Sequence, residues 1–213
     1  EIEMDVLLST SYFGPVQWYQ KLFRADRAWI DSYETFQKQT YRNRCIIAAP
    51  NGPQALVVPV ERGDLSPLTS PFSSLIKDLR ISDHGNWRHQ QWNALATAYG
   101  DSPFFEYYED DLRPFFAERN WEYLFEFNLN ICNVICSLID FSPRLALTTD
   151  YAHEVPAGVH DFRESIRPKH PLPDADFQPR PYYQVYAARL GFLPNLSILD
   201  LLFNMGPESI FYL

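Results

Sequence analysis

The chain has 213 residues, 46% of them hydrophobic, and a formal net charge of −9, so it has ample material for a folded core and global disorder is excluded. The acidic balance argues against a general nucleic-acid binder, which needs a basic field to displace counterions from phosphate. No apolar run is long enough to span a bilayer, and residues 1–5 lack the basic-then-apolar pattern of a signal peptide. Three cysteines do not make a disulfide framework, so we expect a cytoplasmic protein.

The beginning of the chain predicts a βαβ unit. Residues 5–9 form a short apolar run, residues 16–24 have helical spacing, and residues 27–31 form a second apolar run. A connection of this kind implies parallel strands, and ligands in open parallel sheets bind beyond the carboxyl ends of the strands. Residues 9–13 and 31–33 are therefore expected near a site. The intervening loop lacks the glycine-rich dinucleotide fingerprint, and we expect no cofactor.

A β-hairpin is predicted next. Residues 45–49 and 55–60 are β-rich and are separated by a stretch that contains Asn51-Gly52, a strong hairpin signal. Residues 61–74 are rich in Gly, Pro, Ser and Thr and indicate a surface loop. Residues 78–82 favour another short strand.

Residues 86–141 are expected to form a helical portion. Helical spacing of apolar residues extends over 86–99, 104–112 and 123–141. Ser102 and Pro103 fit an N-cap followed by proline at the first helical position.

The remaining elements complete an α/β fold. Residues 145–149 favour a strand, whereas six prolines between 155 and 181 exclude long regular elements and indicate a lid or a connector. Ser197 is expected to cap the last helix, with Asp200 in a capping-box-like pair. We predict one domain over 1–213, with a small mixed β-sheet, an N-terminal βαβ unit, a β-hairpin and the helical portion.

Residues 81–99 have an unusual composition for a helix and suggest a site. His84 and His89 are candidates for acid–base catalysis, because imidazole titrates near neutrality. The structural alternative is that both only buttress the helix through hydrogen bonds. Their spacing of five does not place them on one helical face, and no metal site is expected. Asn93 lies four residues after His89 and shares its face.

Three arginines could hold an anionic substrate, since guanidinium offers a planar donor fork to phosphate or carboxylate. They are Arg42, Arg44 and Arg88. Their alternative role is to pair with the protein's own surplus of carboxylates. Lys38 is a further candidate clamp. We expect the fold to bring this region, residues 81–99 and the C-terminal end of the chain around one pocket.

Several segments spread over nearly the whole chain resemble the WbqC-like protein family. They are Tyr12-Phe13-Gly14-Pro15, Lys38 with Tyr41-Arg42-Asn43-Arg44, Trp87 with Tyr99 and Pro103-Phe104-Phe105, Tyr182-Tyr183-Gln184, and the closing run 191–206. The resemblance implies a bacterial setting in surface polysaccharide gene clusters and a role in attaching an acyl or aminoacyl group to an amino sugar. Residues 149–181 depart from the family pattern, so substrate specificity does not transfer through that region.

The functional hypothesis is a transferase that acts on an anionic sugar-nucleotide or amino-sugar intermediate. The three arginines would hold the anionic part, either histidine would take a proton from the attacking amine, and Asn93 and Asn195 would orient hydroxyls or amides. Tyr41, Tyr183 and Gln184, from the motifs that carry the resemblance, join Lys38 as candidate substrate-binding residues. The competing hypothesis is a non-catalytic binding or scaffold protein that uses the same cleft for a protein partner.

Overall fold

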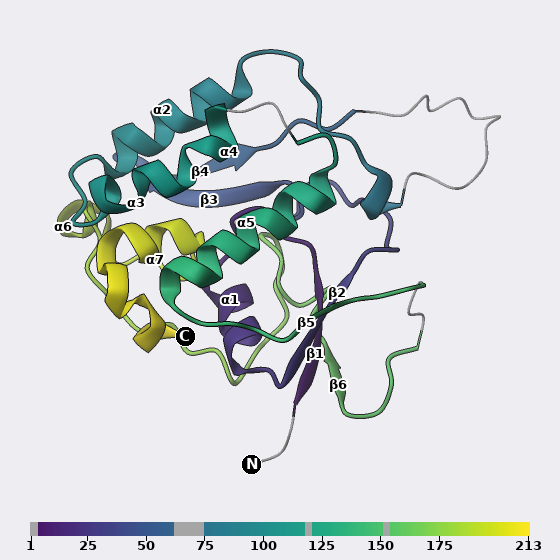
Figure 1. Cartoon of the computed structure of the whole chain (residues 1–213). Helices are drawn as coiled ribbons and strands as arrows, with labels where there is room; N and C mark the ends of the chain where they lie inside the picture. The colour runs from purple at the N-terminus through teal and green to yellow at the C-terminus, as the bar shows by residue number, and fades with distance from the viewer. Residues whose placement is uncertain (1–3, 62–74, 118–120, 151–153) are drawn as a thin grey trace.

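The computed structural model describes residues 4–61, 75–117, 121–150 and 154–213. The predicted βαβ unit is present, and its two strands pair in parallel from Asp5 opposite Arg27 to Ser9 opposite Asp31. Two further strands extend the sheet to the order β5-β2-β1-β6, with every pairing parallel (Figure 1). The elements are β1 (Asp5–Ser9), α1 (Val16–Arg24), β2 (Arg27–Asp31), β5 (Leu145–Leu147) and β6 (Val159–Asp161).

The predicted hairpin forms a second, antiparallel sheet. Its strands are β3 (Arg44–Ala49) and β4 (Gly52–Val57), joined through Pro50 and Asn51. Cys45 and Ile47 are buried in alternation along β3, which fixes the register because a slip of one residue would turn them to the other face. The α/β fold with parallel and antiparallel strands is thus confirmed, with the two kinds of strand in separate sheets.

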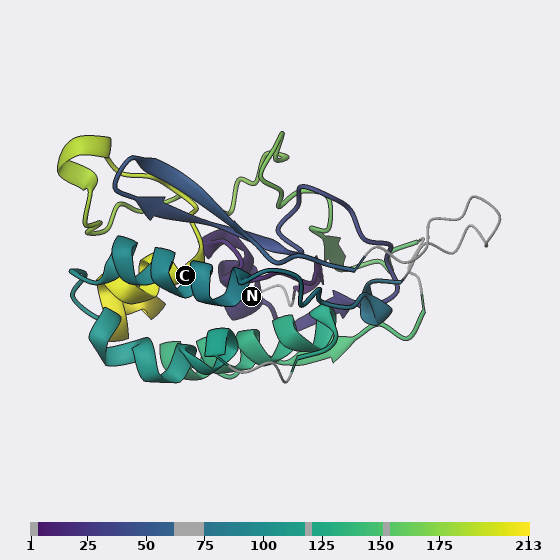
Figure 2. The same ribbon diagram turned by 90° about the horizontal axis from the view of Figure 1, so that it is seen from above.

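The helical portion packs onto the hairpin. Figure 2 shows α2 between the β3–β4 hairpin and α4, in agreement with the contacts among these elements. Aromatic side chains fill this region, with the rings of Phe13 and Phe116 stacked 5.9 Å apart and those of Trp92 and Phe105 5.7 Å apart. The helices are α2 (Trp87–Tyr99), α3 (Phe105–Leu112), α4 (Pro114–Ala117) and α5 (Leu124–Ile139).

The C-terminal helix α7 (Ile198–Met205) packs against β3, α1 and α3, and its residues 198–204 are all buried (Figure 1). It follows the short helix α6 (Ala187–Leu190) and continues into the 3₁₀ helix η2 (Gly206–Tyr212). Ser197 caps α7 as predicted, accepting a hydrogen bond at Oγ from the Leu199 amide. The predicted capping-box role of Asp200 is wrong. Its buried carboxylate accepts hydrogen bonds from the side chains of Tyr99, Tyr182 and Gln184 instead.

Two local predictions were also wrong. Residues 78–82 do not form a strand: η1 (Ile76–Asp78) is a 3₁₀ turn. Arg80 and Ile81 form only isolated bridges, to Tyr123 and Val60 respectively, and neither bridge continues into a ladder. Helix α3 begins at Phe105 rather than Pro103, and Ser102 provides no cap. The surface loop expected at 61–74 lies, for residues 62–74, outside the described residues.

The proline-rich region contains the short strand β6 and then a long irregular segment. Residues 162–178, which we call the strap, contain no helix or strand. The strap returns across the side of the parallel sheet where α1 packs, since its Asp174 and Asp176 hydrogen-bond to side chains of that helix. Among the described residues, no helix is long and apolar enough to cross a membrane.

Candidate functional site

The carboxyl ends of the parallel strands carry a buried polar network. Asp31, at the end of β2, is fully buried and accepts hydrogen bonds from Thr148 Oγ1 at 3.2 Å and from Arg163 Nη1 at 2.8 Å. Arg163 also forms an ion pair with Asp161, at the end of β6. Residues at or just after the carboxyl ends of three of the four strands, β5, β2 and β6, are therefore joined at one edge of the parallel sheet.

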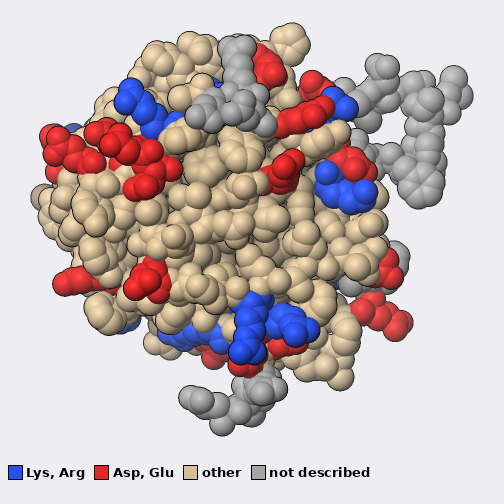
Figure 3. Space-filling view, in the orientation of Figure 1, with Lys and Arg blue, Asp and Glu red and all other residues tan. Residues whose placement is uncertain are grey.

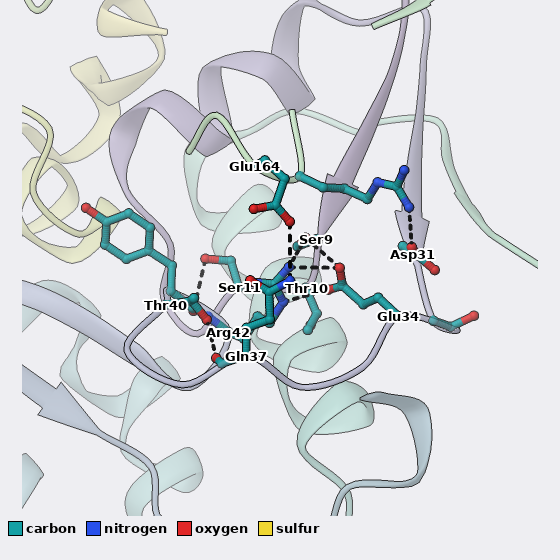
Figure 4. A network of polar contacts seen from close by, with 12 residues as sticks. Ser9, Thr10, Ser11, Asp31, Glu34, Gln37, Thr40, Arg42 and Glu164 are labelled. Carbon is teal, nitrogen blue, oxygen red and sulfur yellow. Dashed lines mark hydrogen bonds and ion pairs between the residues drawn. The ribbon is translucent and has the colours of Figure 1, made fainter. Parts of the chain in front are cut away.

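The same edge holds a closed ring of three side chains. Arg42 donates from Nε and Nη2 to the two oxygens of Glu34, both at 2.8 Å, and from Nη2 to Ser9 Oγ at 2.9 Å, while Ser9 Oγ donates to Glu34 at 3.0 Å (Figure 4). Burial raises the pKa of Glu34, and the hydrogen bonds from Arg42 oppose this only in part. Arg42 is thus neutralised by an internal carboxylate. This is the alternative to a substrate-binding role, in which the arginine pairs with one of the protein's own carboxylates.

A small cavity lies beside this ring. Its volume is about 10 Å³, which admits no more than one water molecule. Burial raises the pKa of Tyr41, one of its lining residues, to about 12, so the phenol stays protonated as a hydrogen-bond donor. The lining residues are Ser9, Thr10, Ser11, Trp18, Tyr41, Arg42, Phe162, Arg163 and Ile166.

A much larger cavity, of about 300 Å³, lies at the start of α2. Its size is at the lower end of small-molecule sites. Two guanidinium groups and one imidazole line it, together with aromatic rings and small residues. None of its eight lining residues, all in the described part of the chain, is acidic. They are Gly85, Asn86, Arg88, His89, Trp92, Arg113, Phe116 and Ala117.

The two arginines of this α2 cavity lie against tryptophan rings. Cζ of Arg88 is 4.5 Å from the ring centroid of Trp87, and Cζ of Arg113 is 5.8 Å from that of Trp92. Arg88 is 7% exposed and pairs with Asp83 through Nη2 at 2.9 Å, while its buried Nε has no hydrogen-bond partner. A buried donor without an acceptor is costly, so an acceptor on a ligand would be favourable there.

His89 is exposed at the same cavity, and its Nε2 lies 3.1 Å from the side-chain amide nitrogen of Asn93. The side-chain amide nitrogen of Asn93 can only donate, so Nε2 is the acceptor and the neutral ring carries its proton on Nδ1. The predicted pair of His89 and Asn93 on one face is therefore present, and it fixes the tautomer of the imidazole.

The other candidate residues lie elsewhere, and the expectation of one common pocket was wrong. His84 and Lys38 are exposed and line neither cavity, and Tyr183 is 57% exposed. Arg44 starts β3, half-buried, with an unpaired buried Nε.

Two candidates from the C-terminal motif have structural partners. The side chain of Gln184 donates to Asp200 and Leu193 O and accepts from the Leu193 amide, so all of it is engaged inside the protein. Asn195, with φ of 54°, accepts at Oδ1 from the Gln17 amide in the first turn of α1. Both residues hold the C-terminal loop in place.

Arg113, Glu34 and Arg163 were missed by the sequence analysis. Arg113 stands at the end of an acidic helical run, whose Glu106, Asp110 and Asp111 are exposed, and such a run indicates a solvated surface. Figure 3 shows acidic side chains gathered on the surface over α3. Only the packing of α4 against α2 brings the Arg113 guanidinium to Trp92. Among the described residues, no group of three or more His, Cys, Asp or Glu is arranged to hold a metal ion.

A comparison with protein families matches residues 10–160 to the model of the WbqC-like protein family. The chain belongs to the WbqC-like family. The matched range contains all the residues that line the α2 cavity. Of the carboxyl-edge network it contains Asp31, Glu34, Arg42 and Thr148, whereas Ser9, Asp161 and Arg163 lie just outside it. Membership also agrees with the segments that carried the resemblance at the N-terminal end.

This WbqC-like protein is similar to a curated protein of Mycobacterium tuberculosis strain H37Rv, which is described as "Uncharacterized protein Rv1507c". The two are 28% identical over 202 residues, which cover 84% of this chain and 83% of the relative. No solved structure matches the chain. Any activity must therefore be argued from the site.

Proposed function

We propose that this WbqC-like protein is a transferase that modifies an anionic amino-sugar or sugar-nucleotide intermediate by acyl or aminoacyl transfer, with the α2 cavity as its site. The observation that carries the proposal is the pairing of two guanidinium groups with an imidazole in one cavity that has no acidic lining residue. This composition is notable in a chain of net charge −9.

Arg88 and Arg113 would bind the phosphate or carboxylate of the substrate. The unpaired Nε of Arg88 offers a donor in a partly desolvated position, where a charge-assisted hydrogen bond is stronger than in water. Trp92 provides an apolar wall that suits the face of a sugar ring or a base. Arg113 is exposed and can adjust to the ligand.

His89 would act as the general base. In acyl transfer to an amine, the amine nitrogen attacks the carbonyl carbon of the donor and loses a proton, and the donor's leaving group departs. The imidazole of His89, held by Asn93, would accept that proton. A positioned base of this kind contributes about 10²–10⁴-fold to a rate.

A thermal-shift screen of nucleotide sugars, acyl thioesters and amino acids tests the binding step. Ligands that bind the native state raise the melting temperature by mass action. We expect a shift with one class and its loss in Arg113→Ala, because the lost contact weakens binding by about 1–3 kcal/mol. Arg144→Ala, at another exposed arginine, is the matched control and should keep the shift. An equal shift in wild type and Arg113→Ala contradicts the assignment.

The chemical step is tested separately with the ligand pair found in the screen. His89→Gln should keep the thermal shift and lose product formation, whereas His84→Gln should retain both, since His84 does not line the cavity.

The second candidate function is a non-catalytic binding protein, which the 57% exposure of Tyr183 favours. Ligand binding without any product, and with equal behaviour of the two histidine variants, would support that alternative.

A further inference from the structure

The strap closes the carboxyl edge of the parallel sheet. Phe162, Arg163 and Ile166 of the strap form one side of the small cavity there, and the loop after β1 together with Tyr41 and Arg42 forms the other side. Glu164 extends the contact by accepting a hydrogen bond from Gln37 at 3.3 Å (Figure 4). The strap is therefore the cover of this cavity.

Helix α1 presents a buried polar face that holds the strap. Lys21 is 2% exposed, with Nζ 2.6 Å from Asp174 Oδ2 and 4.9 Å from the centroid of the Phe162 ring, so one cation contacts both ends of the strap. One helical turn earlier, Gln17 donates to the same carboxylate at 2.9 Å. Gln20 donates to the carbonyl of Asp176 at 3.2 Å.

Most of the contacts that hold the strap are polar and can be replaced by water, whereas Ile166, Phe162 and Phe177 provide its apolar packing against the core. Ile166 is the one buried residue among residues 162–178. When a polar contact opens to solvent, its partners regain hydrogen bonds to water, so its net contribution to stability is small, whereas exposure of an apolar core is costly. Arg163, at the start of the strap, keeps its ion pairs with Asp31 and Asp161, and the strap beyond it can lift away at lower free energy than the sheet beneath it can unfold.

The surface under the strap consists of hydrogen-bond donors. It presents the hydroxyls of Ser9, Thr10 and Ser11, the phenol of Tyr41 and the guanidinium of Arg42. No carboxylate is among the described residues lining the cavity, because Glu34 and Asp31 lie behind the guanidinium groups that they neutralise. Converging donors with nearby cations match an oxyanion.

We propose that the strap is a lid over a second binding site, at the carboxyl edge of the parallel sheet, which takes the oxyanion group of a small molecule, a phosphoryl group or a carboxylate. This site is separate from the α2 cavity and does not depend on the transfer reaction assigned there. In the closed form the space of about 10 Å³ admits one water, so a ligand enters only after the strap lifts and Lys21 separates from Asp174.

Hydrogen-exchange mass spectrometry of the full chain, with inorganic phosphate or acetate added in separate arms, tests the site. We expect the anion that binds the site to slow exchange in residues 9–12 and 162–178. Protection by phosphate indicates a phosphoryl ligand, and protection by acetate indicates a carboxylate ligand. Slower exchange only in residues 86–93 would support the α2 cavity and overturn the second site. Slower exchange only at the carboxyl edge would support the second site and give no support to anion binding in the α2 cavity.

The variant Lys21→Met tests the lid, because it keeps the apolar stem of the side chain and removes the ion pair. We expect exchange across the strap to rise at least tenfold while β1 stays as in wild type. Unchanged strap exchange overturns the lid. If the strap of Lys21→Met does open more often, it no longer limits access to the site. In that case, a variant that neither phosphate nor acetate protects overturns the second site as well.

A lining residue provides the matched test of binding. Ser11 donates only a long hydrogen bond of 3.4 Å to the Tyr41 carbonyl, so Ser11→Ala should fold normally. We expect it to weaken anion protection about fivefold to tenfold, while Ser142→Ala, at an exposed position, leaves protection unchanged. Equal protection in the two serine variants contradicts the assigned lining.

Discussion

Lys21 Nζ lies 2.6 Å from Asp174 Oδ2, which joins the first helix of the chain to a segment more than a hundred and fifty residues later. The ion pair has a direct effect on titration. Burial alone would raise the pKa of Asp174, but hydrogen bonds from Lys21 and Gln17 outweigh it, so the pKa lies below its ordinary value.

The closed strap should therefore be insensitive to pH until strongly acidic conditions. A carboxyl whose folded-state pKa is depressed stabilises the folded form fully above its unfolded value of about 3.9, and the contribution is lost as pH falls through the folded value. We expect strap exchange, corrected for its intrinsic pH dependence, to stay constant from about pH 7 to 5 and to rise below about pH 4. Asp174→Asn should show fast exchange throughout; a pH profile like that of wild type would contradict this reading.

The Glu34–Arg42 pair should show strong coupling. Glu34→Gln leaves the buried Arg42 guanidinium without its counter-charge, and we expect a loss of about 3 kcal/mol in the free energy of unfolding. Arg42→Met should cost a similar amount, and the double variant less than the sum of both, as measured by urea denaturation. If the loss of unfolding free energy in the double variant equals the sum of the two single losses, Glu34 and Arg42 are not coupled as proposed.

A surface pair supplies the control for that cycle. Arg80 and Glu122 also form an ion pair, but their side chains are 52% and 57% exposed. Solvent screens such a pair, so Glu122→Gln should change the free energy of unfolding by less than about 1 kcal/mol.

Gly206 should not tolerate alanine. Its φ is +55°, and an added Cβ would lie 2.6 Å from the ring of Phe104. Left-handed backbone costs about 1–2 kcal/mol for a residue with a side chain, and overpacking adds about 1–3 kcal/mol. Gly158→Ala is the control with φ of +87° and open space around the new Cβ, so it should show only the backbone cost in thermal denaturation. Equal losses in the two variants would mean that Phe104 moves aside freely.

The cysteines should be chemically inert in the folded protein. Cys45 borders Arg44 in sequence, and a nearby cation lowers the pKa of a thiol, but burial raises the pKa of Cys45 to about 12. The thiolate is the reactive form, so iodoacetamide at about pH 8 should label Cys45 only after unfolding. Cys132 and Cys136 are buried as well and should behave alike. Labelling of native protein at the rate of the denatured chain would contradict the structure.

The sequence was sufficient for elements whose signals are local. The short apolar runs of β1 and β2, the Asn51-Gly52 hairpin signal and the helical spacing over α5 each indicate a backbone state from a few neighbouring residues. The resemblance to the WbqC-like family also rested on contiguous motifs, and the family match confirms it. Among the site residues, Arg88 and His89 were found together because one helix turn carries both.

Only the tertiary structure decided how charges were paired and which residues shared a cavity. Arg42 was equally compatible with a substrate clamp and an internal ion pair, and the choice depended on Glu34, which reaches it across a loop. Asp200 has the spacing of a capping-box partner, yet its carboxylate accepts hydrogen bonds from the hydroxyls of Tyr99 and Tyr182, which lie in other segments of the chain. Hydrogen bonds and ion pairs act over about 3 Å in space without regard to separation along the chain, whereas sequence patterns report only neighbours within a turn or a strand. For this reason the helices and strands could be predicted from the sequence, while the α2 cavity with Arg113 and the strap held by Lys21 could not.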